Sequence, residues 1–165
     1  MTVWLLDKER AKEAWDRVRQ VKSVSVAEQD PDKAKEWQKK IEKRYRSIVR
    51  GSTAMIQRNG LGQFLAFLAS KGFSGGKRVE NKREKADALL YQHVGHWLII
   101  GMKLQDNPPN SNDIQPGATN DPLEYLLAKN RALEEIMWAT NEALAYLQWS
   151  KRFVESQLEE PDEED

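Results

Sequence analysis

Two histidines, three residues apart, are the side chains of this 165-residue sequence best suited to acid–base or metal chemistry. His93 and His96 lie in an apolar segment, and their spacing places both imidazoles on one face of a helix. Zinc needs three or four ligands, and this segment offers neither a third ligand nor a His-Glu-x-x-His spacing. The chain has no cysteine, which excludes disulfides and cysteine-ligated metals. We expect core or boundary histidines, with no metal and no cofactor.

Glycine-rich and acidic segments also lack the patterns that catalysis requires. Residues 72–78 (GFSGGKR) have three residues between their outer glycines where a phosphate-binding loop has four, and Arg78 replaces the magnesium-binding Ser or Thr. Gly60 and Gly62 lack the third glycine of a dinucleotide site. Carboxylates at 134–135 and 162–165 fall on an expected helix surface and at the chain end, not in a cleft. The sequence predicts a protein that is not an enzyme.

Basic residues after Pro31 form the clearest functional pattern. Plotted at 100° per residue with Ile41 as the centre of the apolar stripe, five cations fall about 120° to 200° away. This strip runs ~22 Å in steps of ~5–6 Å, so it can follow a nucleic-acid backbone and displace its counterions. Its members are Lys35, Lys39, Lys43, Arg46 and Arg50. Such a strip binds the phosphates of a nucleic acid and does not recognise base sequence. The other interpretation is an ordinary solvated helix face.

Further cations are candidates to extend this basic strip. Arg58 and Lys71 stand at either end of the apolar segment 61–69. Beyond the glycine-rich segment follow Lys77, Arg78, Lys82, Arg83 and Lys85.

The charge of the chain is divided between its halves, although the formal net charge is zero. Residues 1–90 carry 21 basic and 12 acidic side chains, and residues 91–165 carry 5 basic and 14 acidic ones. This asymmetry indicates an anionic partner for the basic half. If the halves lie on different faces, copies of the chain would also associate weakly head to tail, through a contact that does not close on itself.

The elements that position these residues are expected to be helices. No stretch alternates with the period of two that a half-buried strand needs. We predict an all-α compact bundle of about five to seven helices, in one domain over residues 1–158, with a disordered acidic tail over 159–165. Helices are expected near residues 4–18, 31–58, 61–69, 80–104, 122–128 and 131–158. The Pro- and Asn-rich segment 105–122 and the glycine-rich residues 72–76 are expected to be loops.

Apolar residues within these helices indicate which faces are buried. Trp4, Trp15, Trp37 and Trp97 are expected in the core, and Trp138 and Trp149 in contacts with another subunit. The last helix has a seam with steps of four and three, which is expected to pack along an antiparallel neighbour. The seam consists of Leu133, Met137, Thr140, Leu144, Leu147, Lys151, Val154 and Leu158.

The sequence also indicates a cellular compartment. No apolar run approaches the ~18 residues of a membrane helix. The N-terminal residues lack the leading positive charge of a signal peptide. We therefore expect a cytoplasmic protein.

Three segments resemble a known family, and the two outer ones are more specific than generic helix patterns. They are residues 45–50 and 55–68 (YRSIVR and MIQRNGLGQFLAFL), 89–98 (LLYQHVGHWL) and 138–153 (WATNEALAYLQWSKRF). The first and last resemble the two signatures of the small all-helical subunit of type III-B CRISPR effectors, the Cmr complex, and the second is similar to the middle helix of that family. The order of the blocks also agrees with the family.

The resemblance implies a non-catalytic subunit that acts in antiviral defence. Several copies would lie beside the backbone subunits, the large polymerase-like subunit, the guide RNA and the bound target RNA. The cations in or beside the matching blocks are Arg46, Arg50, Arg58, Lys71, Lys151 and Arg152.

Two hypotheses remain open at this stage. In the first, the chain is a scaffold subunit that contacts the backbone of guide and target RNA. In the second, it is a purely protein-binding helical adaptor without RNA contact. The nucleic-acid-binding residues under the first hypothesis are Lys35, Lys39, Lys43, Arg46, Arg50, Arg58, Lys71, Lys151 and Arg152. Lys151 interrupts an apolar seam, so it is also a candidate to extend its charge into solvent for structural reasons alone.

Overall fold

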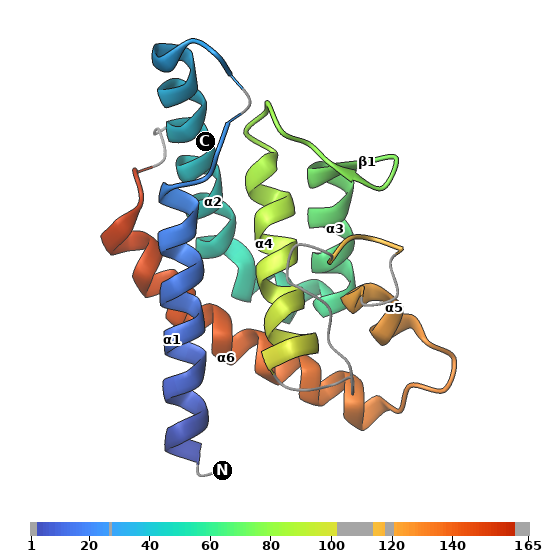
Figure 1. The fold of residues 1–165 in the computed structure, drawn as a ribbon. Coiled ribbons are helices and arrows are strands. Elements are labelled where there is room, and N and C mark those ends of the chain that lie inside the picture. The colour runs from blue at the N-terminus through green and yellow to red at the C-terminus, as the bar shows by residue number, and fades with distance from the viewer. Residues whose placement is uncertain (1–2, 27, 102–113, 118–120, 161–165) are drawn as a thin grey trace.

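Helices contain most of the residues that the computed structural model describes, which are 3–26, 28–101, 114–117 and 121–160 (Figure 1). The helices are α1 (Val3–Lys22), α2 (Pro31–Asn59), α3 (Leu61–Gly72), α4 (Lys85–His96), the π-helical η1 (Trp97–Gly101), α5 (Pro122–Leu127) and α6 (Leu133–Gln157). The prediction of an all-α bundle is confirmed. Most of the expected loop at 105–122 and residues 161–165 of the expected tail lie outside the described residues, and the domain limit at residue 158 stays a prediction.

Local sequence signals explain where two of these helices begin. Asp30 caps α2, because its carboxylate accepts the backbone N–H two residues on, and Pro31 occupies the first helical position. Asp121 and Pro122 play the same roles in α5. Between α2 and α3, Gly60 adopts a φ of 90°, a conformation that favours glycine. The Asp-Pro and Asn-Gly signals were therefore correct as helix boundaries.

Helix α4 runs through the middle of the bundle (Figure 1). Every residue from Lys85 to Gly95 is buried, because α2 and α3 pack directly against this helix. At Gly72, α3 comes so close to α4 that an added Cβ would lie 2.3 Å from the backbone nitrogen of Ala88. Helix α6 runs across α1 and α2 (Figure 1). The core therefore joins segments from both ends of the chain.

The core is mainly apolar but includes a part-buried ion pair between Arg10 and Glu142. Its largest fully buried apolar side chains are Tyr45, Tyr91, Tyr146, Phe64, Ile41, Ile56, Leu65, Leu68, Leu90, Leu98 and Ile99. Beside them, the carboxylate of Glu142 on α6 accepts hydrogen bonds from Arg10 Nε on α1 at 3.1 Å and from Trp97 Nε1 at 3.2 Å. This carboxylate thus connects α1, η1 and α6.

The segment before α4 differs from the prediction. Residues expected to form a flexible loop make a hairpin, in which β1 (Phe73–Ser74) pairs antiparallel with β2 (Lys77–Arg78). Gly75 and Gly76 close it with φ values of 58° and 77°. The helix expected from residue 80 therefore begins only at Lys85. Lys85 itself, a candidate for the basic patch, is buried, and its Nζ donates to the carbonyl of Ser25 at 2.8 Å and contacts Glu80.

The expected apolar seam of α6 is wrong in its first half. Leu133 and Met137 are 68% and 55% exposed. The buried face instead contains the small residues Ala139, Ala143 and Ser150. Small side chains suit a helix that crosses its neighbours closely, whereas the heptad seam assumed a long antiparallel contact. The later seam residues Leu147, Val154 and Leu158 are buried as expected.

The tryptophans are less uniformly buried than predicted. Trp97 is a core residue, and it stacks on Tyr146 with ring centroids 5.8 Å apart. Trp15 and Trp37 are only half-buried, which corrects the expectation for both residues. The side chain of Trp4 lies outside the described part of the structure.

Candidate nucleic-acid interface

The buried face of α2 is broader than one stripe centred on Ile41. Its members are Ile41, Glu42, Tyr45, Arg46, Val49, Ser52, Thr53 and Ile56. On a helical wheel these residues cover an arc of about 140° that begins at Ile41. The arc is wide because α2 packs against both α6 and the pair α3 and α4. Residues at the far edge of the arc are therefore buried, although the wheel placed them opposite the core.

Arg46 is the cation that this wider arc removes from the exposed strip. It is 7% exposed, and its guanidinium donates to the carbonyl oxygens of Leu158 at 3.0 Å and Glu155 at 3.4 Å. A further contact at 3.4 Å joins Arg46 to the carboxylate of Glu160. The placement of Arg46 on the exposed strip was wrong. Its contacts show instead that it fastens the C-terminal end of α6 to α2.

The other four cations of the predicted strip remain at the surface of α2, and we call them the α2 strip. Lys35, Lys39 and Arg50 are exposed, and Lys43 is half-buried. Arg50 Nε lies 3.8 Å from the Glu155 carboxylate, and both side chains are 52% exposed. A pair this long and this accessible to solvent is weak, so a phosphate can compete for the arginine. The α2 strip retains a row of cations about 22 Å long.

The remaining predicted cations lie on other parts of the surface. Arg58 is exposed near the end of α2, about 12 Å along the helix from Arg50, and Lys71 is exposed near the end of α3. On α6, Arg152 is exposed and Lys151 is half-buried. Lys151 Nζ lies 3.4 Å from the Thr53 hydroxyl on α2. These cations extend the basic surface without forming a single site with the α2 strip.

Beside the α2 strip, the structure contains a groove that the sequence did not indicate. Its volume is about 610 Å³. One wall belongs to α2, and the other belongs to the turn before α4. We call it the basic groove, and it is lined by Trp37, Lys40, Lys43, Arg44, Ser47, Lys82, Arg83 and Glu84. Five of these eight residues are cations and one is an acid, Glu84, whose carboxylate lies 3.5 Å from Arg83 Nε, so the lining is mainly basic.

Contacts within the basic groove hold part of this charge in place. Arg44 makes two hydrogen bonds, of 3.1 and 3.0 Å, to the buried carboxylate of Asp87. Lys40 Nζ lies 4.7 Å above the centre of the Trp37 ring and 3.2 Å from Glu36. Arg44 is therefore fixed by a bidentate pair, whereas Lys40 is held by weaker contacts at the surface.

Carboxylates at the end of α6 lie against the basic helix α2. Glu155 and Glu160 contact Arg50 and Arg46. The acidic and basic halves of the chain therefore meet inside one molecule at this point, whereas head-to-tail association requires them on different faces.

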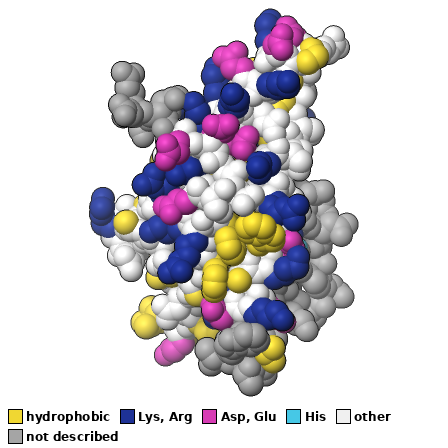
Figure 2. All heavy atoms as spheres, turned by 90° about the vertical axis from the view of Figure 1, so that its left-hand side faces the viewer, with side chains coloured by type: hydrophobic (Ala, Val, Ile, Leu, Met, Phe, Trp, Pro, Cys, Tyr) yellow, Lys and Arg dark blue, Asp and Glu magenta, His cyan; other side chains and the backbone are white. Residues whose placement is uncertain are grey.

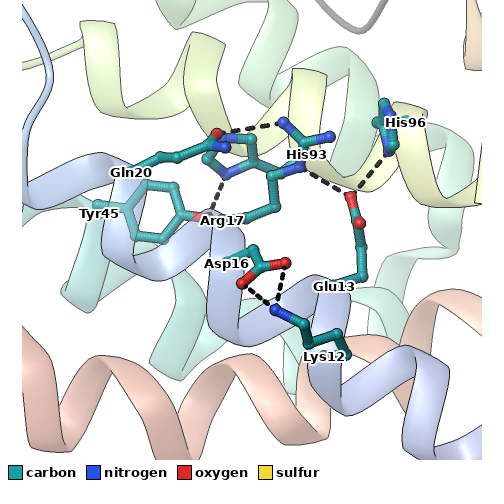
Figure 3. Close-up of polar contacts among 8 residues, drawn as sticks. All are labelled: Lys12, Glu13, Asp16, Arg17, Gln20, Tyr45, His93 and His96. Carbon is teal, nitrogen blue, oxygen red and sulfur yellow. Dashed lines mark hydrogen bonds and ion pairs between the residues drawn. The ribbon is translucent and has the colours of Figure 1, made fainter.

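The two histidines of α4 make separate polar contacts, His93 with α2 and His96 with α1 (Figure 3). Tyr45 Oη and His93 Nδ1 are hydrogen-bonded at 2.6 Å, and burial lowers the pKa of His93 to about 3. His96 Nδ1 and Arg17 Nε lie 2.8 and 2.7 Å from one oxygen of Glu13. Burial alone would raise the pKa of Glu13, but the bonds from His96 and Arg17 lower it to about 2.

These contacts agree with a structural role for the histidines. A histidine with a pKa near 3 is neutral at pH 7 and is poorly matched to general acid catalysis there. No group of three or more potential metal ligands occurs among the described residues.

A family comparison shows what kind of protein carries these sites. The family model described as CRISPR-associated protein (Cas_Cmr5) matches residues 6–157. The chain belongs to this Cmr5 family. A Cmr5-family protein is the small subunit of the type III-B Cmr complex, so the chain associates with other proteins of that complex. The match confirms the family to which the three sequence blocks pointed.

The Cmr5 match covers both basic sites of the structure. The α2 strip and the basic groove fall within residues 35–84, well inside the matched region. Sequence reasoning missed Trp37, Lys40, Arg44 and Ser47, because the groove exists only where α2 meets the turn before α4. One signal in the sequence could have grouped these four residues. On the helical wheel they lie together next to Lys43, about 240° to 320° from Ile41.

One further property of this Cmr5 chain concerns membranes. No helix in the described ranges combines the length and apolar composition that a membrane span requires.

Proposed function

We propose that this Cmr5-family chain is a non-catalytic scaffold subunit whose α2 strip contacts the phosphate backbone of guide or target RNA. The observation that carries the proposal is the row of Lys35, Lys39, Lys43 and Arg50 along one side of α2. Successive members stand four, four and seven residues apart, which gives rises of about 6, 6 and 10 Å. Each cation that meets a phosphate releases a counterion, and the resulting affinity does not depend on base sequence.

Other predicted cations have secondary roles in this proposal. Arg58, Lys71 and Arg152 are exposed and supply additional positive charge toward RNA. Lys151 contributes less, because its ammonium group already contacts Thr53. Arg46 has no role in RNA contact, since its guanidinium is bonded to the end of α6. The chain would act in antiviral defence in the cytoplasm, together with the proteins and RNA of the complex.

The proposal is tested on the assembled complex with a variant that neutralises the α2 strip. Lys35, Lys39, Lys43 and Arg50 are replaced with Gln, and retention of labelled target RNA is measured. The control replaces Lys8, Lys12 and Arg19, three exposed cations of α1, with Gln. We expect the strip variant to assemble normally but to lose RNA, and the control to keep it. Equal RNA retention by complexes that contain the wild type, the strip variant or the α1 control would refute the proposal.

The alternative role as a protein-binding adaptor is favoured by exposed apolar side chains. Leu133, Met137 and Trp138 are 68%, 55% and 39% exposed on the first turns of α6. On the side of the bundle where α1 lies, hydrophobic side chains are also visible between Lys and Arg (Figure 2). A purely protein-binding chain predicts that the strip variant fails to join the complex even without RNA. Pull-down of the other subunits by the strip variant separates the two roles.

Weak head-to-tail self-association is a further part of the proposal for partners. The opposite charges of the two halves support it, whereas the contacts of Glu155 and Glu160 with α2 within one molecule reduce the acidic surface available. Sedimentation of the purified chain at low and high salt tests it. Association that weakens with salt supports the proposal, and a monomer at every salt concentration contradicts it.

A further inference from the structure

We propose that the basic groove binds a short single-stranded segment of RNA, with an unpaired nucleotide against Trp37 and its phosphates on the surrounding cations. This inference rests on the proposed function, and it adds a second and different mode of RNA contact. The α2 strip is an open row of charges suited to a backbone. The basic groove is concave and contains an aromatic wall, so it can hold the nucleotide itself.

The size and lining of the groove favour a ligand of one or two nucleotides. Its volume of about 610 Å³ falls in the range of pockets that bind small molecules, roughly 300–1,000 Å³. Cations line both walls, with Lys40, Lys43 and Arg44 on α2 facing Lys82 and Arg83 on the turn before α4. Phosphates that enter between these walls meet positive charge from two sides.

Trp37 is the feature that distinguishes a nucleotide from a simple anion. An indole ring is half-buried in the lining, where a base or ribose can pack against it. Proteins that bind single strands combine a positively charged groove with such aromatic platforms. Lys40 now lies over the ring at 4.7 Å, and its ammonium group is at the surface. A bound strand gives Lys40 a phosphate in exchange for this cation–π contact and leaves the ring to the base.

Arg44 is the cation of the groove lining that is held most firmly in place. Its two hydrogen bonds to the fully buried Asp87 hold the guanidinium against the start of α4. The positive charge of Arg44 therefore stays in a fixed position in the groove lining, where it attracts an entering phosphate.

A duplex would use this groove less well than a single strand. Its bases are stacked and paired inside the helix, so only its phosphates reach the lining. Single-stranded RNA has unstacked bases that pack on aromatic side chains. The groove therefore predicts a preference for unpaired RNA that depends on Trp37, whereas the α2 strip predicts no such preference.

The test measures binding of a fluorescent oligouridine and of a duplex RNA to the full chain and to the assembled complex. Trp37→Ala is expected to weaken oligouridine binding about 5- to 150-fold and to change duplex binding little. Trp37→Phe should restore most of the loss, because phenylalanine keeps an aromatic face, and Trp37→Leu should not. Trp138→Ala is the matched control in the isolated chain, where no other subunit can contact it, since Trp138 is exposed on α6 away from the groove lining. Far-ultraviolet circular dichroism confirms that each variant is helical.

The outcomes separate this inference from the proposed function. If the α2 strip variant loses RNA but Trp37→Ala binds oligouridine normally, the groove inference is wrong and the proposed function survives. If Trp37→Ala weakens the binding of oligouridine and of duplex equally, or if Trp37→Leu restores oligouridine binding, the proposed packing of a base on the Trp37 ring is wrong. If Trp37→Ala and Lys82→Gln reduce only association with other subunits, the groove is a protein contact and the inference is overturned.

Discussion

Replacement of His93 gives a prediction whose size follows directly from its burial. His93 is 5% exposed, its Nδ1 is hydrogen-bonded to Tyr45 at 2.6 Å, and its pKa is lowered from 6.5 to about 3 by burial. Above pH 6.5 the imidazole is neutral in both folded and unfolded chains. As the pH falls below 6.5, the unfolded chain gains a proton at this position and the folded chain does not. Stability is therefore lost as the pH falls from about 6.5 toward 3.

The expected size of this loss follows from linkage. Between about pH 7.5 and about pH 5, an unfolded histidine with an ordinary pKa gains most of one proton. Integration of this difference gives a loss of about 2 kcal/mol in the free energy of unfolding. The size of this loss does not depend on the exact pKa of His93 in the folded state, provided that this pKa stays below about 4. His93→Gln removes the titrating group and keeps a side chain that can accept a hydrogen bond from Tyr45.

The assay is urea denaturation of the wild type and His93→Gln at the two pH values. The wild type should lose about 2 kcal/mol more than the variant on acidification. His96→Gln is the control. It keeps His93, so its unfolded chain still gains a proton at this position and it should lose about as much stability as the wild type. If the wild type and His93→Gln lose the same free energy, His93 is not buried and neutral as described. A histidine that titrates in the folded chain would again be available for acid–base chemistry.

Three further predictions concern stability and its separation from RNA binding. Glu142→Gln removes one of the two carboxylates beside Arg10, whose guanidinium also lies 3.5 Å from Asp7, and should lower the free energy of unfolding by about 1.5–3 kcal/mol in urea denaturation. A loss below about 0.5 kcal/mol would contradict the role of this part-buried pair. Arg46→Met should lower the thermal midpoint but leave RNA affinity unchanged, since its partners lie within the protein; weaker RNA binding in the folded variant would show that Arg46 reaches RNA. Gly72→Ala should destabilise the chain by about 1–3 kcal/mol because its methyl group would strike α4, while Gly62→Ala, with open space around it, should not. Equal stability of the two alanine variants would refute the close helix contact.

Helix positions were predictable because they depend on neighbouring residues. The Asp-Pro pairs at 30–31 and 121–122 begin α2 and α5, and Gly60 separates α2 from α3. The hairpin at 73–78 was missed, since two-residue strands are too short to show an alternating pattern. The Asp-Pro and Asn-Gly signals depend only on neighbouring residues, and the helix boundaries fall where these signals occur.

Burial was less predictable because it depends on which helices meet. The wheel for α2 assumed one buried stripe, and contact with α6 as well as α3 and α4 widened it enough to bury Arg46. The same local reasoning placed Trp37 in the core, although it lines a groove with residues more than 40 positions away. The surface position of the other four α2-strip residues was predictable, because none of them falls within the buried arc of the helix.

The most direct test of RNA contact by α2 is the salt dependence of target-RNA binding by the assembled complex. If each of the four cations in the α2 strip meets one phosphate of a guide–target duplex, replacing all four with Gln should lower the slope of log affinity against log salt by about 3.6. Between about 50 and 200 mM salt, the ratio of wild-type affinity to strip-variant affinity for target RNA should then fall about 150-fold. The α1 control variant should keep the wild-type slope. Identical slopes in the wild type and the strip variant would contradict the account.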